Sequence, residues 1–402
     1  MAGITVLIGF AEALSAPEVA WSLIDSGYDV VAFTRKGRRA ALQHSRHVTT
    51  REITAPESNV EASIADLRQL LETFSTHDGT KRHVLFPLDD TAVWLCDRLS
   101  LPGSWVLAGP SGLAAEFALD KTLQLEAARA ASFHVPPTHM AKTAQDVFNS
   151  ADRFPVTLRP SRAVAPQADR LRRGSNWICN NRQELKNAIA QWQENYPLLV
   201  QPFIAGCGEG VFGIAGKDGV KALTAHRRLR MMNPHGSGSS ACTSQSVPAD
   251  VGASVENLIK SIGWRGLFMV ELLRDRTGTR WFIEFNGRPW GSMALARRQG
   301  FEYPSWAIEM ALDSAWQLRD KPVARSGVIC RNFGRDLMHL LFVLRGPRSK
   351  AMTEWPSFGK SAAAVFRLNS TDTFYNWRKD DRKVFWVDCY YTVCGQIFKR
   401  KG

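Results

Sequence analysis

The sequence predicts an α/β protein that begins with a parallel sheet and continues with a region rich in antiparallel strands. Over the first 115 residues, apolar strand-like runs alternate with amphipathic helical segments, which is the pattern of a βαβ series. From Val211 onward, strand-type segments dominate, and two of them are joined by a tight turn. The two patterns predict an N-terminal domain followed by a different, mixed α/β core.

Length and composition indicate a globular protein of two or three domains. The chain has 402 residues, of which 45% are hydrophobic and 22% are charged. The seven cysteines form no CxxC pair and no Cys/His cluster at metal-ligand spacing, which favours a reducing, cytoplasmic environment. No secretory signal is visible, and no apolar run reaches the roughly 20 residues of a spanning helix, so we expect no transmembrane segment.

The N-terminal domain is expected over residues 1–115. Its predicted strands and helices, in chain order, are Ile4–Ile8, Ala16–Ser26, Asp29–Phe33, Val60–Phe74, His83–Pro87 and Thr91–Leu99. The loop after the first strand lacks GxGxxG spacing, so a dinucleotide site is not favoured there. Asp89 and Asp90 follow a predicted strand, where they either cap the next helix or bind a ligand.

A segment rich in Gly, Pro and Ser over residues 101–112 indicates a domain boundary. Beyond it we expect a helix that contains Asp120 and Lys121 and runs to about Ala131. The predicted divisions are a small α/β unit over 116–205, a larger strand-rich unit over 206–330, and a basic, aromatic C-terminal region over 331–402. A basic loop is expected between Arg159 and Gly174.

The strongest chemical signal is a predicted hairpin of Gly266–Leu273 and Arg280–Asn286. If its turn centres on Thr277 and Gly278, Glu271 lies opposite Glu284. Like charges facing each other destabilise a sheet, so a cation between them explains both acids.

Asn286 points to the same face as Glu284, and three such oxygen ligands suit Mg²⁺ held together with substrate phosphates. The alternative at this stage is that the acids pair with Arg274 or Arg280. Arg288 lies just past the expected metal ligands, where a forked cation can stabilise a transferring phosphoryl group.

From Asp120 to about Leu312 the chain resembles the ATP-grasp superfamily, especially its carboxylate–amine ligase and carbamoyl-phosphate-synthase-like branch. The resemblance rests on an acid on one strand, Glu271, followed by E-x-N-x-R on the next. Further matching positions are Glu284, Asn286, Arg288, Trp290, Gly291, Ser292, Ala294, Ala296, Gly300 and Pro304. It implies an ATP-grasp core that follows a pre-ATP-grasp N-terminal domain.

The resemblance also implies a nucleotide site. Asp120-Lys121 followed by His134–Thr138 is similar to the segment whose lysine lies near phosphate, and Gln201, Phe203 and Ile204 fall on the strand that reads adenine. Glu209 falls where an acid contacts ribose. Arg159 stands where the family has lysine, and the glycine-rich flap is replaced by the arginine-containing segment 162–173.

The segment Ala225–Arg230, with the Ser/Gly-rich residues 236–240, is similar to the stretch that borders the acceptor site. Arg227 or Arg228 is expected to clamp a substrate carboxylate. His226 is either a packed histidine or a general base.

The resulting expectation is an ATP-dependent ligase, with Mg²⁺ or Mn²⁺, that activates a carboxylate as an acyl phosphate for attack by an amine. The alternatives are a bicarbonate-phosphorylating carboxylase and an ATP-binding module that has lost turnover, the latter because of Arg159 and the missing flap.

The net charge is +13, and 14 Lys/Arg against 6 Asp/Glu in residues 331–402 place +8 of it there. We expect a solvated basic face that leaves contact with anionic membrane surfaces open, and do not favour nucleic acid as a partner. The oligomeric state stays undetermined.

Overall fold

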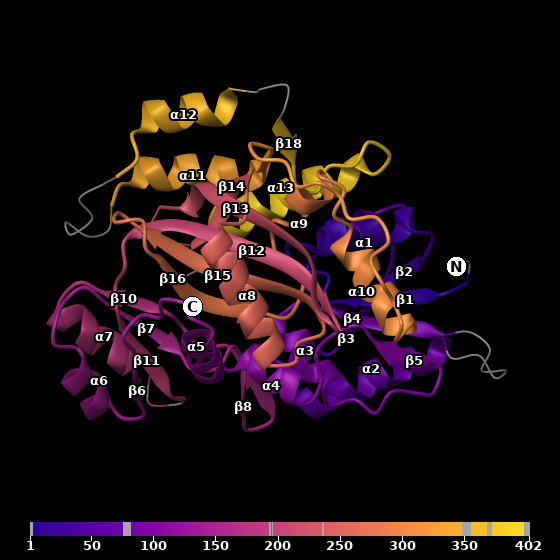
Figure 1. The fold of residues 1–402 in the computed structure, drawn as a ribbon, viewed down its shortest axis with the longest axis horizontal. Coiled ribbons are helices and arrows are strands. Elements are labelled where there is room, and N and C mark those ends of the chain that lie inside the picture. Colours follow the sequence, from indigo (N-terminus) through magenta and orange to yellow (C-terminus); the bar gives the residue numbers. More distant parts are fainter. Residues whose placement is uncertain are drawn as a thin grey trace.

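The computed structural model describes residues 3–74, 82–192, 194, 196–234, 237–347, 355–367 and 372–397. Within them the strands form sheets of five, four and seven strands and a separate two-stranded hairpin (Figure 1). The parallel N-terminal sheet and the antiparallel region beyond it confirm the predicted fold class.

The N-terminal sheet has the strand order β3-β2-β1-β4-β5, and all its neighbours run parallel. Its elements are β1 (Thr5–Gly9), α1 (Ala16–Asp25), β2 (Asp29–Arg35), η1 (Ala41–His44), β3 (Thr49–Ile53), α2 (Val60–Phe74), β4 (His83–Pro87), α3 (Asp90–Cys96) and β5 (Trp105–Leu107). Leu7 and Ile8 point into separate cores on the two faces, so β1 is continuously apolar. The sequence prediction lacked β3, which is largely polar, and β5, which is only three residues long.

The four-stranded sheet has the order β10-β7-β11-β6. Its elements are β6 (His139–Ala141), α6 (Ala144–Ser150), β7 (Val156–Pro160), β10 (Trp177–Cys179), α7 (Arg182–Trp192) and β11 (Leu198–Pro202). The segment predicted as a basic loop contains a hairpin of β8 (Ala165–Gln167) and β9 (Arg170–Arg172). The loop prediction was therefore wrong at these residues.

The chain enters this unit through two helices, α4 (Leu113–Leu119) and α5 (Lys121–Ala130). Asp120 was predicted to lie within a helix, but it has an extended backbone between the two. Its carboxylate accepts a hydrogen bond from the backbone N–H of Thr122 at 2.8 Å. Asp120 is thus the N-cap of α5, a role that commonly contributes about 1 kcal/mol.

The seven-stranded sheet has the order β16-β15-β12-β13-β14-β17-β18. Its elements are β12 (Gly206–Gly216), β13 (Gly219–Asn233), β14 (Ser237–Gln245), α8 (Ala249–Ser261), β15 (Gly266–Asp275), β16 (Arg280–Asn286), α9 (Met293–Arg297), α10 (Tyr303–Leu312), β17 (Ile329–Arg331) and β18 (Asp372–Phe374). One face packs on α4, α5 and α8, and the other shares a core with α10 and the N-terminal sheet. The candidate site lies on this second face.

The C-terminal region adds α11 (Phe333–Arg345), α12 (Phe358–Phe366) and α13 (Arg382–Ile397). Helix α11 lies beside β13 (Figure 1), and α13 packs on both α11 and η1. Since β17 and β18 belong to the large sheet, this region is joined to the core by backbone pairing.

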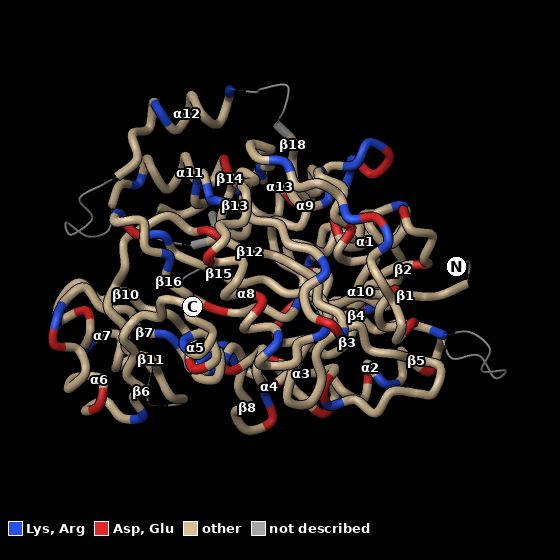
Figure 2. The backbone as a smooth tube through the Cα atoms, viewed as in Figure 1, with Lys and Arg blue, Asp and Glu red and all other residues tan. Residues whose placement is uncertain are grey.

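Lys and Arg residues occur in all parts of the described chain and are interspersed with Asp and Glu (Figure 2). The terminal cluster of Lys399, Arg400 and Lys401 lies outside the described residues. No described helix is long and apolar enough to cross a membrane.

Candidate functional site

The site is organised by the hairpin of β15 and β16. Asp275 closes its turn by accepting hydrogen bonds from the backbone N–H groups of Thr277 and Thr279, and Gly278 adopts a positive φ of 94°. Next to the turn Arg274 faces Arg280, but farther along Glu271 faces Glu284, as predicted.

The strand pairing shifts by one residue between these two pairs, because Ile283 is an extra residue in β16 and forms a β-bulge. The bulge places Phe282 in the apolar core on one face and Glu284 on the other face. In a regular strand Phe282 and Glu284 would lie on the same face, because they are two positions apart. The bulge therefore places Glu284 on the face of Glu271.

The two facing acids bind different cations. An Arg228 Nη lies 2.6 Å from Glu271 Oε1, and an Arg159 Nη lies 2.8 Å from Glu284 Oε2. The expected alternative, pairing with Arg274 or Arg280, does not occur, because both of these arginines pair with Glu209. Glu271 and Glu284 thus belong to a separate polar cluster.

Arg159 also binds the bulge itself. Its second terminal nitrogen donates a hydrogen bond to the carbonyl of Ile283 at 3.0 Å. The planar fork of arginine can reach the bulged carbonyl and the neighbouring carboxylate at once, which a lysine ammonium on a flexible stem does less well. This geometry gives a physical reason for arginine at the position where the resembled family has lysine.

Lys121 completes the cluster from the first turn of α5, with its Nζ 4.0 Å from Glu284. Gln124, one turn later, hydrogen-bonds both the N–H and the C=O of Phe285 and thereby ties α5 to β16. Burial alone would raise the pKa of Glu284, but Lys121 and Arg159 hold it below its ordinary value. Burial lowers the pKa of Lys121.

Arg288 forms a two-point ion pair with the N-terminal domain. Its Nε and one Nη lie 2.8 and 3.2 Å from the two carboxylate oxygens of Asp90. Burial works against the charged guanidinium, but Asp90 outweighs it and the pKa of Arg288 is raised. Asp89 caps α3 by accepting from the Ala92 N–H at 2.7 Å, so the expected capping role holds for Asp89, whereas Asp90 binds arginine.

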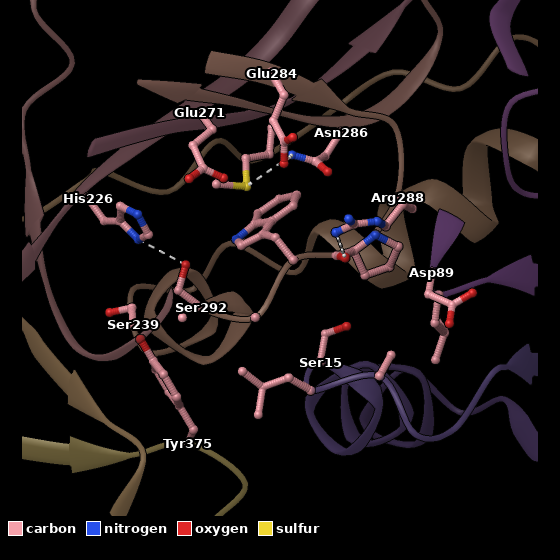
Figure 3. A pocket seen from close by; sticks show the side chains of 18 of the residues that line it. Ser15, Asp89, His226, Ser239, Glu271, Glu284, Asn286, Arg288, Ser292 and Tyr375 are labelled. Carbon is pink, nitrogen blue, oxygen red and sulfur yellow. Dashed lines mark hydrogen bonds between the residues drawn. The ribbon is translucent and has the colours of Figure 1, made fainter. Parts of the chain in front are cut away.

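Glu271, Glu284, Arg228 and Arg288 line a cavity of about 580 Å³, whereas Lys121, Arg159 and Asp90 are not part of its lining (Figure 3). Ser15 and Asp89 come from the N-terminal domain, whereas Glu271, Glu284 and Asn286 come from the hairpin. The full lining is Ala13, Leu14, Ser15, Leu88, Asp89, Arg173, His226, Arg228, Gly238, Ser239, Met269, Glu271, Glu284, Asn286, Arg288, Pro289, Trp290, Gly291, Ser292, Arg335 and Tyr375. Three parts of the chain therefore enclose one polar site.

The structure separates the two arginines that were predicted to clamp a substrate. His226 and Arg228, two positions apart on β13, both line the cavity. Arg227 faces Glu209 in the strand register and is not part of the lining, so the structure does not bring it to this cavity. Residues 235 and 236 of the Ser/Gly-rich segment lie outside the described part of the chain.

His226 is a packed histidine in this structure. Its Nδ1 lies 2.9 Å from the Ser292 hydroxyl, and its ring packs edge-on against Phe212. Burial, with a smaller contribution from the charge of Arg228, lowers the pKa of His226 to about 3. The imidazole is therefore neutral at neutral pH.

The residues predicted for the adenine side lie at the end of β11. Gln201 is buried and donates to the hydroxyl of Thr138 at 2.8 Å, and the Phe203 N–H donates to the Pro155 carbonyl. Phe203 is partly exposed and Ile204 is half-buried. None of the three lines the cavity, and neither does Glu209, which is 1% exposed.

Sequence reasoning missed several cavity residues, among them Arg335 on α11 and Tyr375 just after β18. Both come from the C-terminal region, far along the chain from the hairpin. The excess of basic and aromatic residues there was the available signal, but it does not identify individual positions.

Solved structures of other proteins share this architecture, although the sequence comparisons found no match. No protein-family model matches the sequence, and no curated protein sequence matches it significantly. An L-amino acid ligase from Bacillus licheniformis has a similar structure, with a TM-score of 0.58, 16% sequence identity, and coverage of 78% of this chain and 75% of the ligase.

Two further solved structures are similar. The biotin carboxylase domain of 2-oxoglutarate carboxylase from Hydrogenobacter thermophilus has a TM-score of 0.60 and 16% identity, with 81% of this chain and 73% of that one covered. N5-carboxyaminoimidazole synthetase from Staphylococcus aureus has a TM-score of 0.58 and 16% identity, with 98% of both chains covered. The chain has the ATP-grasp fold.

Proposed function

We propose that the protein is an ATP-dependent ligase that activates a carboxylate as an acyl phosphate and joins it to an amine, with release of ADP and phosphate. The observation that carries the proposal is the pair Glu271 and Glu284, which face each other. Beside Glu284 lie Lys121 and Arg159, two cationic side chains of the kind that bind phosphate. The similar solved structures, which include ligases and an ADP-magnesium complex, support the same reading.

The donor set fits Mg²⁺ or Mn²⁺. Glu271, Glu284 and Asn286 line the same cavity, with the Asn286 amide nitrogen 3.4 Å from Glu284 Oε1, and the amide oxygen would bind the cation. No cluster of three or more His, Cys, Asp or Glu side chains suited to a metal occurs among the described residues. Two carboxylates and an amide suit Mg²⁺ that also binds substrate phosphates, rather than an all-protein cage. When bound, the ion neutralises phosphate charge.

The chain's own residues supply the remaining electrostatics. Lys121 and Arg159 would hold the phosphates from the side of the four-stranded sheet, and Gln201, Phe203 and Ile204 would face the adenine. Arg288 would bind the carboxylate under attack, and its pair with Asp90 holds the guanidinium in a fixed orientation. Arg228 would contact the same substrate while it orients Glu271.

The test is ADP release from ATP and Mg²⁺ with a panel of amino acids and other carboxylates, comparing wild type, Arg288→Ala and the exposed control Arg68→Ala. Turnover that depends on the panel and is lost only in Arg288→Ala supports the ligase. Turnover with bicarbonate alone would instead assign a carboxylase-type reaction. ATP binding without turnover for any panel member would assign a non-catalytic module.

A further inference from the structure

Arg335 differs from the other arginines that line the cavity. Arg228, Arg288 and Arg173 each have a carboxylate within 4.0 Å, in Glu271, Asp90 and Asp90 respectively. Among the described residues, no carboxylate lies within that distance of Arg335. Within the described part of the chain, its side chain makes one hydrogen bond, from Nη1 to the Ser239 carbonyl at 3.1 Å.

The surroundings of Arg335 are unfavourable for an unpaired charge. Burial lowers the pKa of the Arg335 guanidinium, which is partly buried by its accessible surface, and the charge of Asp388 offsets this only in part. Asp388 accepts hydrogen bonds from Asn332 and Asn376 instead. A partly buried cation without an anionic partner loses hydration, and an anionic ligand would offset that cost.

A second unpaired donor lies beside it. Tyr375 is 2% exposed, and its hydroxyl has no hydrogen-bond partner in the described chain, although the Cys242 thiol, a weak partner, lies close. The backbone of Tyr375 is fixed by the bond from its N–H to the Arg331 carbonyl. In Figure 3 the ring extends toward Ser239, at the end of the cavity away from Arg288.

The backbone leaves room for this guanidinium. Gly238 has a φ of +51°, and a Cβ there would lie 2.9 Å from Arg335 Nη1. A side chain at position 238 would therefore both strain the backbone and displace the arginine.

We propose that Arg335 and Tyr375 form an anion subsite that binds a substrate carboxylate other than the one that is activated. The proposal rests on the proposed ligase function for the identity of the substrates. The second carboxylate belongs either to the amine, which is then an amino acid, or to the acyl donor, which is then a dicarboxylate. A forked guanidinium and a neighbouring hydroxyl donor match the two oxygens of a carboxylate.

Calorimetric titration in the presence of ADP and Mg²⁺ tests the subsite. The probes are the natural L-amino acids and their α-amides, together with malonate, succinate and glutarate and their monoamides. For wild type we expect at least one acid to bind at least tenfold more tightly than its amide. An amino acid that meets this criterion assigns the carboxylate to the amine, and a dicarboxylate assigns it to the donor.

Arg335→Met should weaken binding of that acid at least tenfold and leave the binding of its amide and of ADP unchanged. Arg335→Lys should recover part of the affinity, and Tyr375→Phe, which removes a hydroxyl whose one nearby partner in the described chain is the weak Cys242 thiol, should weaken binding about threefold to tenfold. Arg345→Met, an exposed position on the same helix, is the matched control.

The proposal is overturned if wild type binds no acid better than its amide, or if Arg335→Met leaves the preference intact. Failure of ADP to bind would count against the proposed function instead, since the comparison of acids with amides still reports on the subsite by itself.

Discussion

Glu271 and Glu284 face each other across β15 and β16, and each is bound by a different arginine, Arg228 and Arg159 respectively. Two carboxylates placed opposite each other weaken a strand pair, and here the bulge at Ile283 adds a local break in the ladder. The proposed cation and phosphate site gives a reason for both features.

Glu284→Gln should reduce magnesium-dependent ADP release at least a hundredfold while the protein stays folded. The amide keeps the shape of the side chain and an acceptor for Arg159, but removes the charge that a metal ion requires. Steady-state ADP release and far-UV circular dichroism measure the two effects. Glu256→Gln, an exposed site on α8, is the control, and full activity of Glu284→Gln would remove the metal assignment.

Arg159→Lys should lower the free energy of unfolding by about 1.5 kcal/mol, because one ammonium cannot replace both hydrogen bonds of the fork. The KM for ATP should also rise severalfold. Urea unfolding of the variant, compared with the exposed Arg172→Lys, measures the first effect. Equal stability of wild type and Arg159→Lys would show that the bulged carbonyl does not depend on arginine.

The facing of Glu271 and Glu284 could be predicted from the sequence because a hairpin is local and its side chains alternate with a period of two. The prediction assumed a turn centred on Thr277 and Gly278 and no bulge. The actual turn is shifted, and the bulge at Ile283 restores the expected pair. Two departures from the assumed geometry thus cancel at the site.

Contacts between segments far apart in the chain could not be predicted from local sequence patterns. Whether Arg227 or Arg228 enters the cavity depends on the face that β13 presents beside β12, which a single strand does not reveal. The pairing of Arg288 with Asp90 joins the segment after β16 to α3, and Arg335 and Tyr375 come from the C-terminal region. These placements follow from packing of whole elements, and local sequence patterns carry little information about it.

Asp90→Asn should make the free energy of unfolding less dependent on pH in the acidic range. Burial would raise the pKa of Asp90, but Arg288 outweighs it and holds the value at about 2, against 3.8 for the free side chain. The unfolded state binds the proton first, so the stabilisation is present above about pH 4 and is lost toward pH 2, a contribution of about 2 kcal/mol.

Urea unfolding of wild type and Asp90→Asn at pH 5 and pH 3 tests this. Wild type should lose about 1 kcal/mol more than the variant over this interval. Identical pH dependence of the two proteins would show that the ion pair with Arg288 does not shift this carboxylate.

His226 should make the protein less stable as the pH falls below neutrality. Its pKa in the folded protein is about 3, because the ring is buried and lies near Arg228, whereas a free histidine has 6.5. Between these values the unfolded chain takes up a proton that the folded protein does not. The stability is therefore complete above about pH 6.5 and declines as the pH falls, by about 2 kcal/mol at pH 5.

His226→Asn should lack this decline, whereas the exposed control His139→Asn should retain it. Urea unfolding midpoints at pH 7 and pH 5 for the three proteins measure the decline. A decline of equal size in His226→Asn would mean that His226 is charged or exposed in the folded state, which would contradict its neutral, packed role.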